Sequence, residues 1–286
     1  MNSAKPSIGA IRYLNALPLV NGLDSDPQVG EVCYEIPSLL AQGLHAGRFD
    51  LALVPQVEVL GAPEYDVVPE ICVACAGPVE SILLFTDRDW SEIRRVAVDV
   101  SSRSSVEMLK VLFQQRTGSV PLCVPAAPNL DPLRSGFDAV LLIGDRALAE
   151  DRGDVPRYDL GQIWWEETGL PFVFAVWAGR RPLAAEAVAA VQRAAQRGVS
   201  RHDELAAAFS REHPDVAGPQ QAARYLSDVI HYTLGDAEEA SLRHFAELRV
   251  AAGLALPTSE PLLRFAGSTP ADLGAPATDA IGAKDE

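Results

Sequence analysis

The sequence predicts an α/β protein of two lobes with a ligand cleft between them. Short apolar runs rich in β-branched residues alternate with segments of helical period, which indicates βαβ units and mostly parallel sheets. This alternation restarts near residue 90, and the apolar run at 170–179 can lead back to the first set of strands. Two such crossings are typical of proteins whose lobes close on a ligand.

The first set of elements covers about the first 87 residues. Strands are expected at 7–12, 31–36, 49–54, 66–76 and 80–86, and helices at 15–23 and 37–47. Asn15 suits the N-cap position of the first helix, and Pro37 and Gly47 open and close the second. The Gly77-Pro78 pair marks a turn between the last two strands.

The second set of elements ends in a long helical region. Strands are expected at 94–100, 121–126, 137–144 and 170–179, with helices at 104–118 and 128–136. Every segment after Pro182 has helical period, at 184–200, 203–213, 220–234 and 236–254. The tail from Gly267 combines Ala, Gly, Pro and Thr with scattered acids, and we expect it to be disordered.

These patterns suggest how the chain divides. Residues 1–87 and 178–266 are expected to form lobe 1, residues 88–177 lobe 2, and residues 267–286 the tail. Hinges would then lie near Thr86–Asp89 and Phe174–Trp177. In folds of this class, ligands bind in the crevice beyond the carboxyl ends of the strands, so strand ends are the place to search for a site.

The charge of the chain disfavours several classes of partner. Its 286 residues include 24 basic and 39 acidic side chains, so the formal net charge is −15. A nucleic-acid surface needs clustered Lys and Arg, and an anionic membrane also repels such a chain. An anionic small molecule is not excluded, because backbone N–H groups at a helix start can hold a carboxylate. The first residues contain no apolar signal core, and no run of about 18 apolar residues occurs, so we expect a soluble cytoplasmic protein.

The four cysteines and five histidines form no metal or nucleophile motif. Cys72 and Cys75 have C-x-x-C spacing, but no second Cys or His pair completes a tetrahedral zinc site. On a strand, their side chains point to opposite faces, so we interpret them as small core residues. No G-x-S-x-G elbow occurs, so an enzyme with this sequence would work by positioning and polarisation, or with a carboxylate as base.

Polar side chains follow the first predicted strand where it meets the next helix. Arg12, Tyr13 and Asn15 lie there, although a buried connection between a strand and a helix needs none of these polar side chains. Asn15 can also be explained as a helix N-cap, and Arg12 as a solvated strand end. Ser81, beside the first expected hinge, is either a ligand-binding residue or an ordinary turn serine.

A serine-rich turn leads from a strand into the first helix of the second half. Ser104 and Glu107 have the S-x-x-E spacing of a capping box, which explains Ser104 without a ligand. Ser101, Ser102 and Ser105 are left free by that box. With the N–H groups of the first helical turn, their hydroxyls can bind a carboxylate or a phosphate.

A further pair of candidates lies where the strand expected at 137–144 ends. Gly144 allows the backbone to approach a ligand closely. Asp145 either contributes to the same site or caps the helix that follows.

Six segments of the chain occur in a specific order. They are IGAIRYLNALPL, PSLLAQGLHAGRFDLALVPQVE, GPVESILLFT, SSRSSVEMLKVLF, DAVLLIGDRAL and YDLGQIWWEETGLPFVFAVWAG. Together they resemble the chorismate dehydratase family of the futalosine route to menaquinone, over roughly residues 8–250. The resemblance implies the two-lobed type II periplasmic-binding-protein fold and an enzyme that uses no metal and no organic cofactor.

By this resemblance, the chain is a carbon–oxygen lyase that removes water from the dianion chorismate and forms 3-[(1-carboxyvinyl)oxy]benzoate. Conjugation to the ring carboxylate acidifies the C3 proton, the C4 hydroxyl leaves, and the product ring is aromatic. The enolpyruvyl carboxylate of the substrate is implied as the base, which agrees with the absence of a histidine motif for a catalytic base in the sequence. The protein must then hold the substrate and exclude water.

The resemblance also assigns residues. Asn15 matches the asparagine of the family's YLN motif, Ser81 matches the serine before its hinge strand, and both are implied as catalytic. Ser104 and Ser105 stand at a polar pair, usually Thr-Ser, at the start of the second-lobe helix. The expected substrate-binding set is Arg12, Tyr13, Ser101, Ser104, Ser105, Gly144 and Asp145, and no metal site is expected.

A non-catalytic small-anion binding protein of the same fold is the main alternative. Such proteins usually carry a signal or lipid anchor, which we do not expect here. An effector domain of a transcription regulator would follow a helix-turn-helix segment. Enzymes that make pyrimidine or thiamine precursors on this fold would show His-rich or Cys-rich motifs near the cleft.

Overall fold

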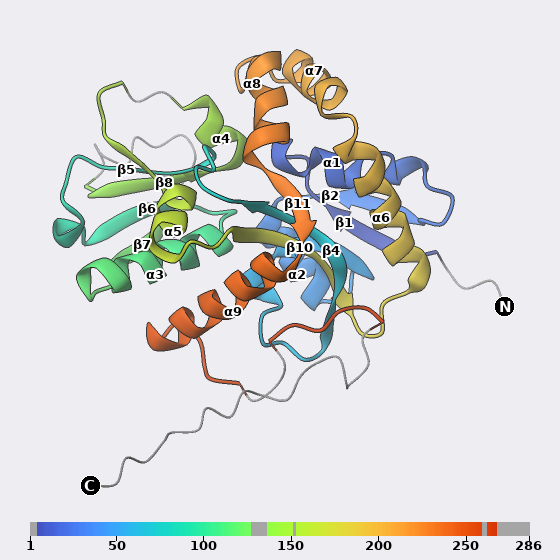
Figure 1. Ribbon diagram of the computed structural model, residues 1–286, viewed down its shortest axis with the longest axis horizontal. Coiled ribbons are helices and arrows are strands. Elements are labelled where there is room, and N and C mark those ends of the chain that lie inside the picture. The colour runs from blue at the N-terminus through green and yellow to red at the C-terminus, as the bar shows by residue number, and fades with distance from the viewer. Residues whose placement is uncertain (1–4, 127–135, 151–152, 259–261, 268–286) are drawn as a thin grey trace, which may run out of the picture.

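The computed structural model describes residues 5–126, 136–150, 153–258 and 262–267. The helix expected at 128–136 and the expected disordered tail lie almost entirely outside these ranges. Two β-sheets lie side by side, each covered by helices, and they form the two lobes (Figure 1). No helix within the described ranges combines the length and the apolar character needed to cross a bilayer.

The larger sheet contains six strands and is mixed. Its strands are β1 (Ser7–Ala10), β2 (Glu31–Tyr34), β3 (Leu51–Pro55), β4 (Tyr65–Cys75), β10 (Phe172–Arg180) and β11 (His231–Leu234), in the order β11-β4-β10-β3-β1-β2. β1 runs parallel to β2 and β3, whereas β10 is antiparallel to both β3 and β4, and β11 is antiparallel to β4. The expectation of mostly parallel sheets is therefore wrong: three of the five strand pairings in this sheet are antiparallel, and β10, which enters from the other lobe, takes part in two of them.

The smaller sheet contains five strands. They are β5 (Ile82–Phe85), β6 (Arg95–Asp99), β7 (Leu122–Ala126), β8 (Ala139–Ile143) and β9 (Arg157–Asp159), in the order β7-β6-β8-β5-β9. β6 runs parallel to β7 and β8, and β5 is antiparallel to β8 and β9. The carboxyl ends of β6 and β8 carry the serine-rich turn and Gly144.

The chain crosses between the sheets earlier than the sequence patterns indicated. β5 pairs wholly within the smaller sheet and β10 wholly within the larger one. The crossings therefore lie at 76–81 and 169–171, before these strands, and the expected hinge positions at 86–89 and 174–177 are wrong. Gly77, with φ 115°, and Gly169, with φ 65°, turn the chain at these points, since both adopt backbone conformations that favour glycine. Whether the lobes move as units stays a prediction.

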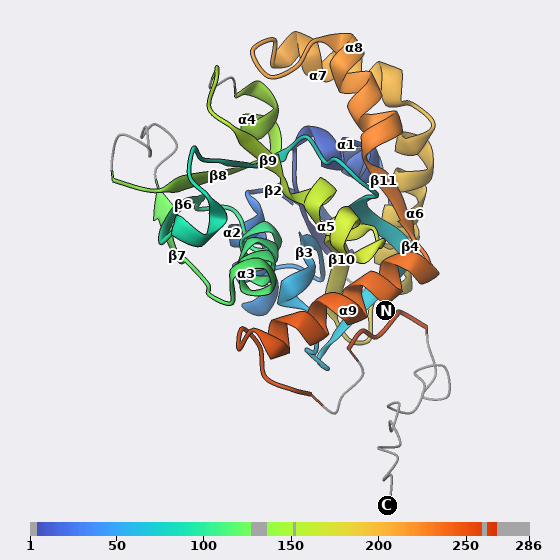
Figure 2. The same cartoon turned by 60° about the vertical axis from the view of Figure 1, so that its left-hand side comes forward.

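Nine α-helices occur within the described residues. They are α1 (Leu17–Val20), α2 (Pro37–His45), α3 (Ser104–Thr117), α4 (Gly144–Ala149), α5 (Leu160–Thr168), α6 (Ala185–Val199), α7 (His202–Glu212), α8 (Pro219–Arg224) and α9 (Asp236–Ala251). Short 3₁₀ turns lie at Leu14–Ala16, Leu23–Ser25, Gln56–Glu58 and Trp90–Glu92, and a π-helical turn at Tyr225–Val229. In Figure 2, α6, α7 and α8 lie together on one side of the molecule, and α9 crosses below α3 and α5.

Three elements differ from the sequence expectation. β9 and α5 were not expected, although Asp159 caps α5 by accepting from the backbone N of Gln162 at 3.0 Å. The helix expected at 220–234 ends in the π turn, and its last residues form β11 instead. The segment VIHYTL is rich in residues that favour strands, and pairing with the free edge of β4 decides its conformation.

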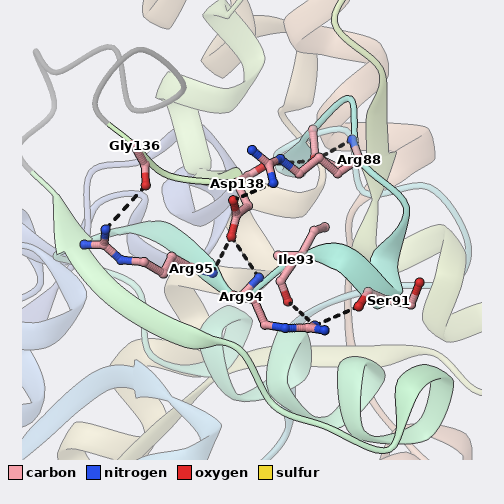
Figure 3. Close-up of polar contacts among 8 residues, drawn as sticks. Arg88, Ser91, Ile93, Arg94, Arg95, Gly136 and Asp138 are labelled. Atoms are coloured by element: carbon pink, nitrogen blue, oxygen red, sulfur yellow. Dashed lines mark hydrogen bonds and ion pairs between the residues drawn. The ribbon is translucent and has the colours of Figure 1, made fainter.

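The core explains two further observations. Cys72 and Cys75 are free thiols buried in β4, which confirms that they are small core residues. Asp138 fixes the amino ends of β6 and β8: its carboxylate accepts from the backbone N of Arg94 and of Arg95 at 2.9 Å and pairs with Arg88 at 3.1 Å (Figure 3). These contacts anchor the smaller sheet at the end opposite to the candidate site.

Helix α6 packs against α1 at a glycine. A Cβ atom added to Gly198 would lie 1.9 Å from the carbonyl oxygen of Pro18. Since α1 directly follows the 3₁₀ turn that carries Asn15, this contact also supports the first turn of the site.

We predict that Gly198→Ala lowers the free energy of unfolding by about 1–3 kcal/mol, because the added methyl group must push α6 away from α1. Urea unfolding measures this change. Gly218→Ala is the control, since no atom lies within 4 Å of the added Cβ. Equal stability of the two variants would contradict the prediction.

Candidate active site

A cleft lies between the two sheets. It contains about 630 Å³ of space not filled by protein atoms, part of which is open solvent. Its lining comes from the turn after β1, the start of β5, the serine-rich turn, the end of β8 and the middle of β10. The sequence-predicted residues that line it are Tyr13, Asn15, Ser81, Ser101, Ser104, Ser105 and Gly144.

Asn15 is not a helix cap, and that expectation is wrong. It lies in the middle of the 3₁₀ turn Leu14–Ala16, so the N-cap position falls on Tyr13, whose carbonyl oxygen accepts from the N of Ala16 at 2.9 Å. Neither this turn nor α1 receives a side-chain cap. The Asn15 amide therefore has no capping role and lines the cleft.

Tyr13 joins the two lobes across the cleft. Its hydroxyl donates to Ser101 Oγ at 3.4 Å, and that hydroxyl donates to Asp99 Oδ1 at 2.5 Å. Burial, together with the nearby carboxylates, raises the pKa of Tyr13, although the contact with Ser101 opposes this shift. The phenol therefore stays protonated and neutral, and Ser101 is held by partners on both sides.

The capping box expected at Ser104 and Glu107 does not form. Ser104 is the first residue of α3, and its hydroxyl donates instead to the carbonyl oxygen of Phe174 in β10 at 2.9 Å. Glu107 pairs with Lys110 at 2.9 Å and with Arg249 at 3.3 Å. The Ser104 hydroxyl and the Glu107 carboxylate therefore bind other partners and do not form the capping interactions that their spacing predicts.

Two other serines of this turn are free to meet a ligand. Ser105 lines the cleft, and no hydrogen bond of its side chain is seen within the described ranges. The hydroxyl of Ser102 is buried without a partner among the described residues, and Ser102 also lines the cleft. Together with the free N–H groups at the start of α3, which has 14 residues, they form a set of donors suited to an anion.

Arg103 is the residue that the sequence analysis missed. It is the one charged residue among the described cleft-lining residues, and its guanidinium lies 3.7 Å from Glu58. Its place in SSRSS, directly before the helix, was the available signal. Arg12, which was expected in the site, is absent from the lining: its guanidinium stacks over the ring of Tyr34, 3.9 Å from the centroid.

Gly144 and Ser81 contact each other in the cleft lining. Gly144 has φ 60°, and a Cβ there would lie 3.2 Å from the ring of Tyr13. Its N donates to the carbonyl oxygen of Ser81 at 2.8 Å. Ser81 Oγ in turn accepts from the hydroxyl of Tyr225 at 2.7 Å.

Asp145 lies behind the cleft lining and contacts the first turn. Its Oδ1 accepts from the backbone N of Leu14 at 2.9 Å, so it links α4 of one lobe to the 3₁₀ turn of the other. Burial raises the pKa of Asp145 to about 6, although the hydrogen bond from Leu14 and the nearby His213 oppose this shift. Its role in this structure is to hold the turn, and it does not line the cleft.

The cleft can hold an anion, but the part of its lining that the structure describes offers no side-chain base. Among the described lining residues there is no Asp, Glu, His, Lys or Cys. The polar groups are hydroxyls, one amide and one guanidinium, and the remaining wall is apolar, with Leu53, Val73 and Phe174 among its members. Such a site can orient a negatively charged molecule and keep water from it.

We predict that Asp145→Asn removes a pH dependence of stability. The folded pKa of about 6 lies above the ordinary value of 3.8, so the protonated form stabilises the fold below about pH 4 and this contribution is lost as pH rises through 6. Between pH 5 and pH 7.5, the unfolding free energy of the parent protein should fall by on the order of 1–2 kcal/mol relative to the variant. Urea unfolding at both pH values tests this, and parallel pH dependences would refute it.

Comparison with known proteins agrees with this geometry. The model of a family described as menaquinone biosynthesis matches residues 6–251. A chorismate dehydratase of Thermus thermophilus is 32% identical over 263 residues, which cover 84% of this chain and 93% of that protein. A 1,4-dihydroxy-6-naphtoate synthase of the same organism is 33% identical over 204 residues, 66% of this chain and 68% of that protein.

Solved structures show the fold. A protein from Archaeoglobus fulgidus matches with a TM-score of 0.72 at 16% identity, covering 89% of this chain and 100% of that one. The periplasmic aliphatic sulphonate binding protein of Escherichia coli matches with a TM-score of 0.61 at 15% identity, covering 90% of both chains. The two-lobed periplasmic-binding-protein-like fold is thereby confirmed, and with the match over residues 6–251 the chain belongs to the menaquinone biosynthesis family.

Proposed function

We propose that this protein is a chorismate dehydratase, a carbon–oxygen lyase that forms 3-[(1-carboxyvinyl)oxy]benzoate in the cytoplasm as a step of menaquinone biosynthesis. The similarity to the Thermus thermophilus enzyme extends over 93% of that protein. The observation that carries the proposal is the composition of the cleft, with neutral donors and one cation around an apolar wall and no side-chain base among the described lining residues.

The proposed reaction needs no basic side chain. The enolpyruvyl carboxylate of chorismate takes the C3 proton, the electrons of that C–H bond form a ring double bond, and the C4–O bond breaks. The leaving hydroxyl and the removed proton together make water, and the ring becomes aromatic. The task left for the protein is to hold the substrate so that its carboxylate reaches C3, which is catalysis by orientation.

The cleft residues suit distinct parts of this task. The start of α3, with Ser102, Arg103 and Ser105, is suited to a carboxylate. The Asn15 amide and the Ser81 hydroxyl are donors whose function does not depend on ionisation, and each can donate to the departing C4 hydroxyl. The apolar wall excludes water that would compete for the same hydrogen bonds.

We predict that the purified protein converts chorismate to the aromatic product, and that EDTA leaves this turnover intact. Proton NMR of the reaction follows the loss of the ring C3 and C4 signals. Tight binding of chorismate without turnover would instead support a non-catalytic binding protein. Inactivity with chorismate, together with activity in a 1,4-dihydroxy-6-naphthoate synthase assay, would favour the activity of the second relative.

We predict that Asn15→Asp lowers turnover or binding by on the order of 100-fold or more. At an effective dielectric constant of ~20, a carboxylate ~4 Å from a substrate carboxylate costs about 4 kcal/mol, part of which protonation can relieve. Thermal melts should show that the variant is folded, because the substitution is isosteric.

The matched control is Asn21→Asp. Asn21 lies at the C-cap of α1, outside the cleft lining, so the same change there should leave the kinetics almost unaltered. A folded Asn15→Asp variant with the kinetics of the control would exclude Asn15 from the site.

A further inference from the structure

We propose that Tyr225 is a positioning residue: it directs the hydroxyl of Ser81 into the cleft as a hydrogen-bond donor. The inference rests on the proposed function and adds a residue from the C-terminal helical region to it. The Tyr225 hydroxyl donates to Ser81 Oγ at 2.7 Å. Both residues are 1% exposed, so water does not compete for this bond.

The protonated state of the phenol is consistent with its role as the donor in this hydrogen bond. Burial raises the pKa of Tyr225 far above its usual range, and the charges of Asp145 and Glu80 add to this, although the bond to Ser81 opposes the shift. The phenol therefore keeps its single proton. Ser81 Oγ is the partner to which the structure shows it donating.

A serine hydroxyl has one hydrogen and two lone pairs. With Tyr225 donating to the oxygen, the Ser81 hydrogen is left for another acceptor, and the cleft that Ser81 lines is where a substrate oxygen would lie. Without Tyr225, the same hydroxyl can rotate and present either a lone pair or its hydrogen. The phenol thus restricts Ser81 to the donor role that the departure of a hydroxyl requires.

The backbone of Ser81 is held independently of Tyr225. Asp159 accepts from the backbone N of Val79 at 3.0 Å and of Glu80 at 2.7 Å. The N of Gly144 donates to the carbonyl oxygen of Ser81 at 2.8 Å. Glu80 itself has φ 61°, a left-handed conformation that these contacts maintain. Removal of the phenol oxygen should therefore leave the position of Ser81 unchanged and release only its hydroxyl.

Adjacent residues of the C-terminal region contact adjacent residues of the crossing. Arg224 pairs with Glu80 at 2.5 Å, and Tyr225 bonds to Ser81. Tyr225 is the first residue of the π turn Tyr225–Val229, an irregular turn that is often found at functional sites. The ion pair holds this segment against the crossing at 76–81 whether or not the phenol oxygen is present.

A second buried tyrosine supplies a matched control. The hydroxyl of Tyr232 in β11 is buried but has no hydrogen-bond partner among the described residues. Tyr232→Phe therefore removes the same atom from a similar apolar setting without touching Ser81. Its stability and kinetics should stay close to those of the parent protein.

The test compares four variants in steady-state dehydration of chorismate, with thermal melts of each. Tyr225→Phe should lower kcat about 10-fold or more with little change in KM, and Tyr232→Phe should leave both unchanged. Ser81→Ala should lose at least as much kcat as Tyr225→Phe. In the double variant, Tyr225→Phe should have no further effect, because its action passes through Ser81.

The outcomes separate this inference from the proposed function. A parent protein that does not dehydrate chorismate overturns both. An active parent protein in which Tyr225→Phe matches Tyr232→Phe overturns the positioning role alone, as does a double variant whose losses multiply. If Tyr225→Phe proves unstable, Ser81→Ala tests the inference instead. Turnover by Ser81→Ala at the level of the parent protein would show that the Ser81 hydroxyl is not needed, and it would overturn the positioning role of Tyr225.

Discussion

The turn that follows β1 must face the second lobe, and the site depends on this constraint. Two hydrogen bonds enforce it: the Tyr13 hydroxyl donates to Ser101, and the N of Leu14 donates to Asp145. Both cross from one sheet to the other, so they place Asn15, which lies beside them in the chain, at the cleft. The glycine at 144 belongs to the same constraint, because a larger residue would meet the Tyr13 ring.

Another part of the cleft lining, at Ser81, is set by a crossing between the lobes. Ser81 ends the segment that leaves the larger sheet, and partners from three parts of the chain hold that segment: Asp159 from α5's N-cap, Gly144 from α4, and Arg224-Tyr225 from the C-terminal region. The C-terminal helices thus do more than cover the larger sheet. They reach the point where the chain passes between lobes, so any motion of the lobes must accommodate these contacts.

Most of the site lies at strand ends, where the sequence predicts it, because a crevice beyond the carboxyl ends of strands is a property of the fold class. The sequence prediction is wrong where a side chain has both a local and a distant partner. Ser104 and Glu107 matched a capping box, yet Phe174 and Arg249 bind them in the fold. Arg12 and Arg103 both lie between a strand and a helix in the sequence. Their tertiary contacts differ: Arg12 stacks over Tyr34, whereas Arg103 lines the cleft. Tyr225 lies 144 positions from Ser81, so no local pattern could have indicated it.

The charge distribution reconciles an acidic protein with the anionic substrate that we propose. The chain carries a formal charge of −15, but none of its acids is among the described residues that line the cleft. Three acids contact residues of this region: Asp99 accepts from Ser101, Asp145 accepts from the N of Leu14, and Glu58 lies 3.7 Å from Arg103. Attraction is then local, from Arg103, the hydroxyls and the start of α3, and screening by salt affects such short contacts little. In the reaction that we propose, the described lining supplies no base, so the geometry of the bound substrate decides which proton is lost.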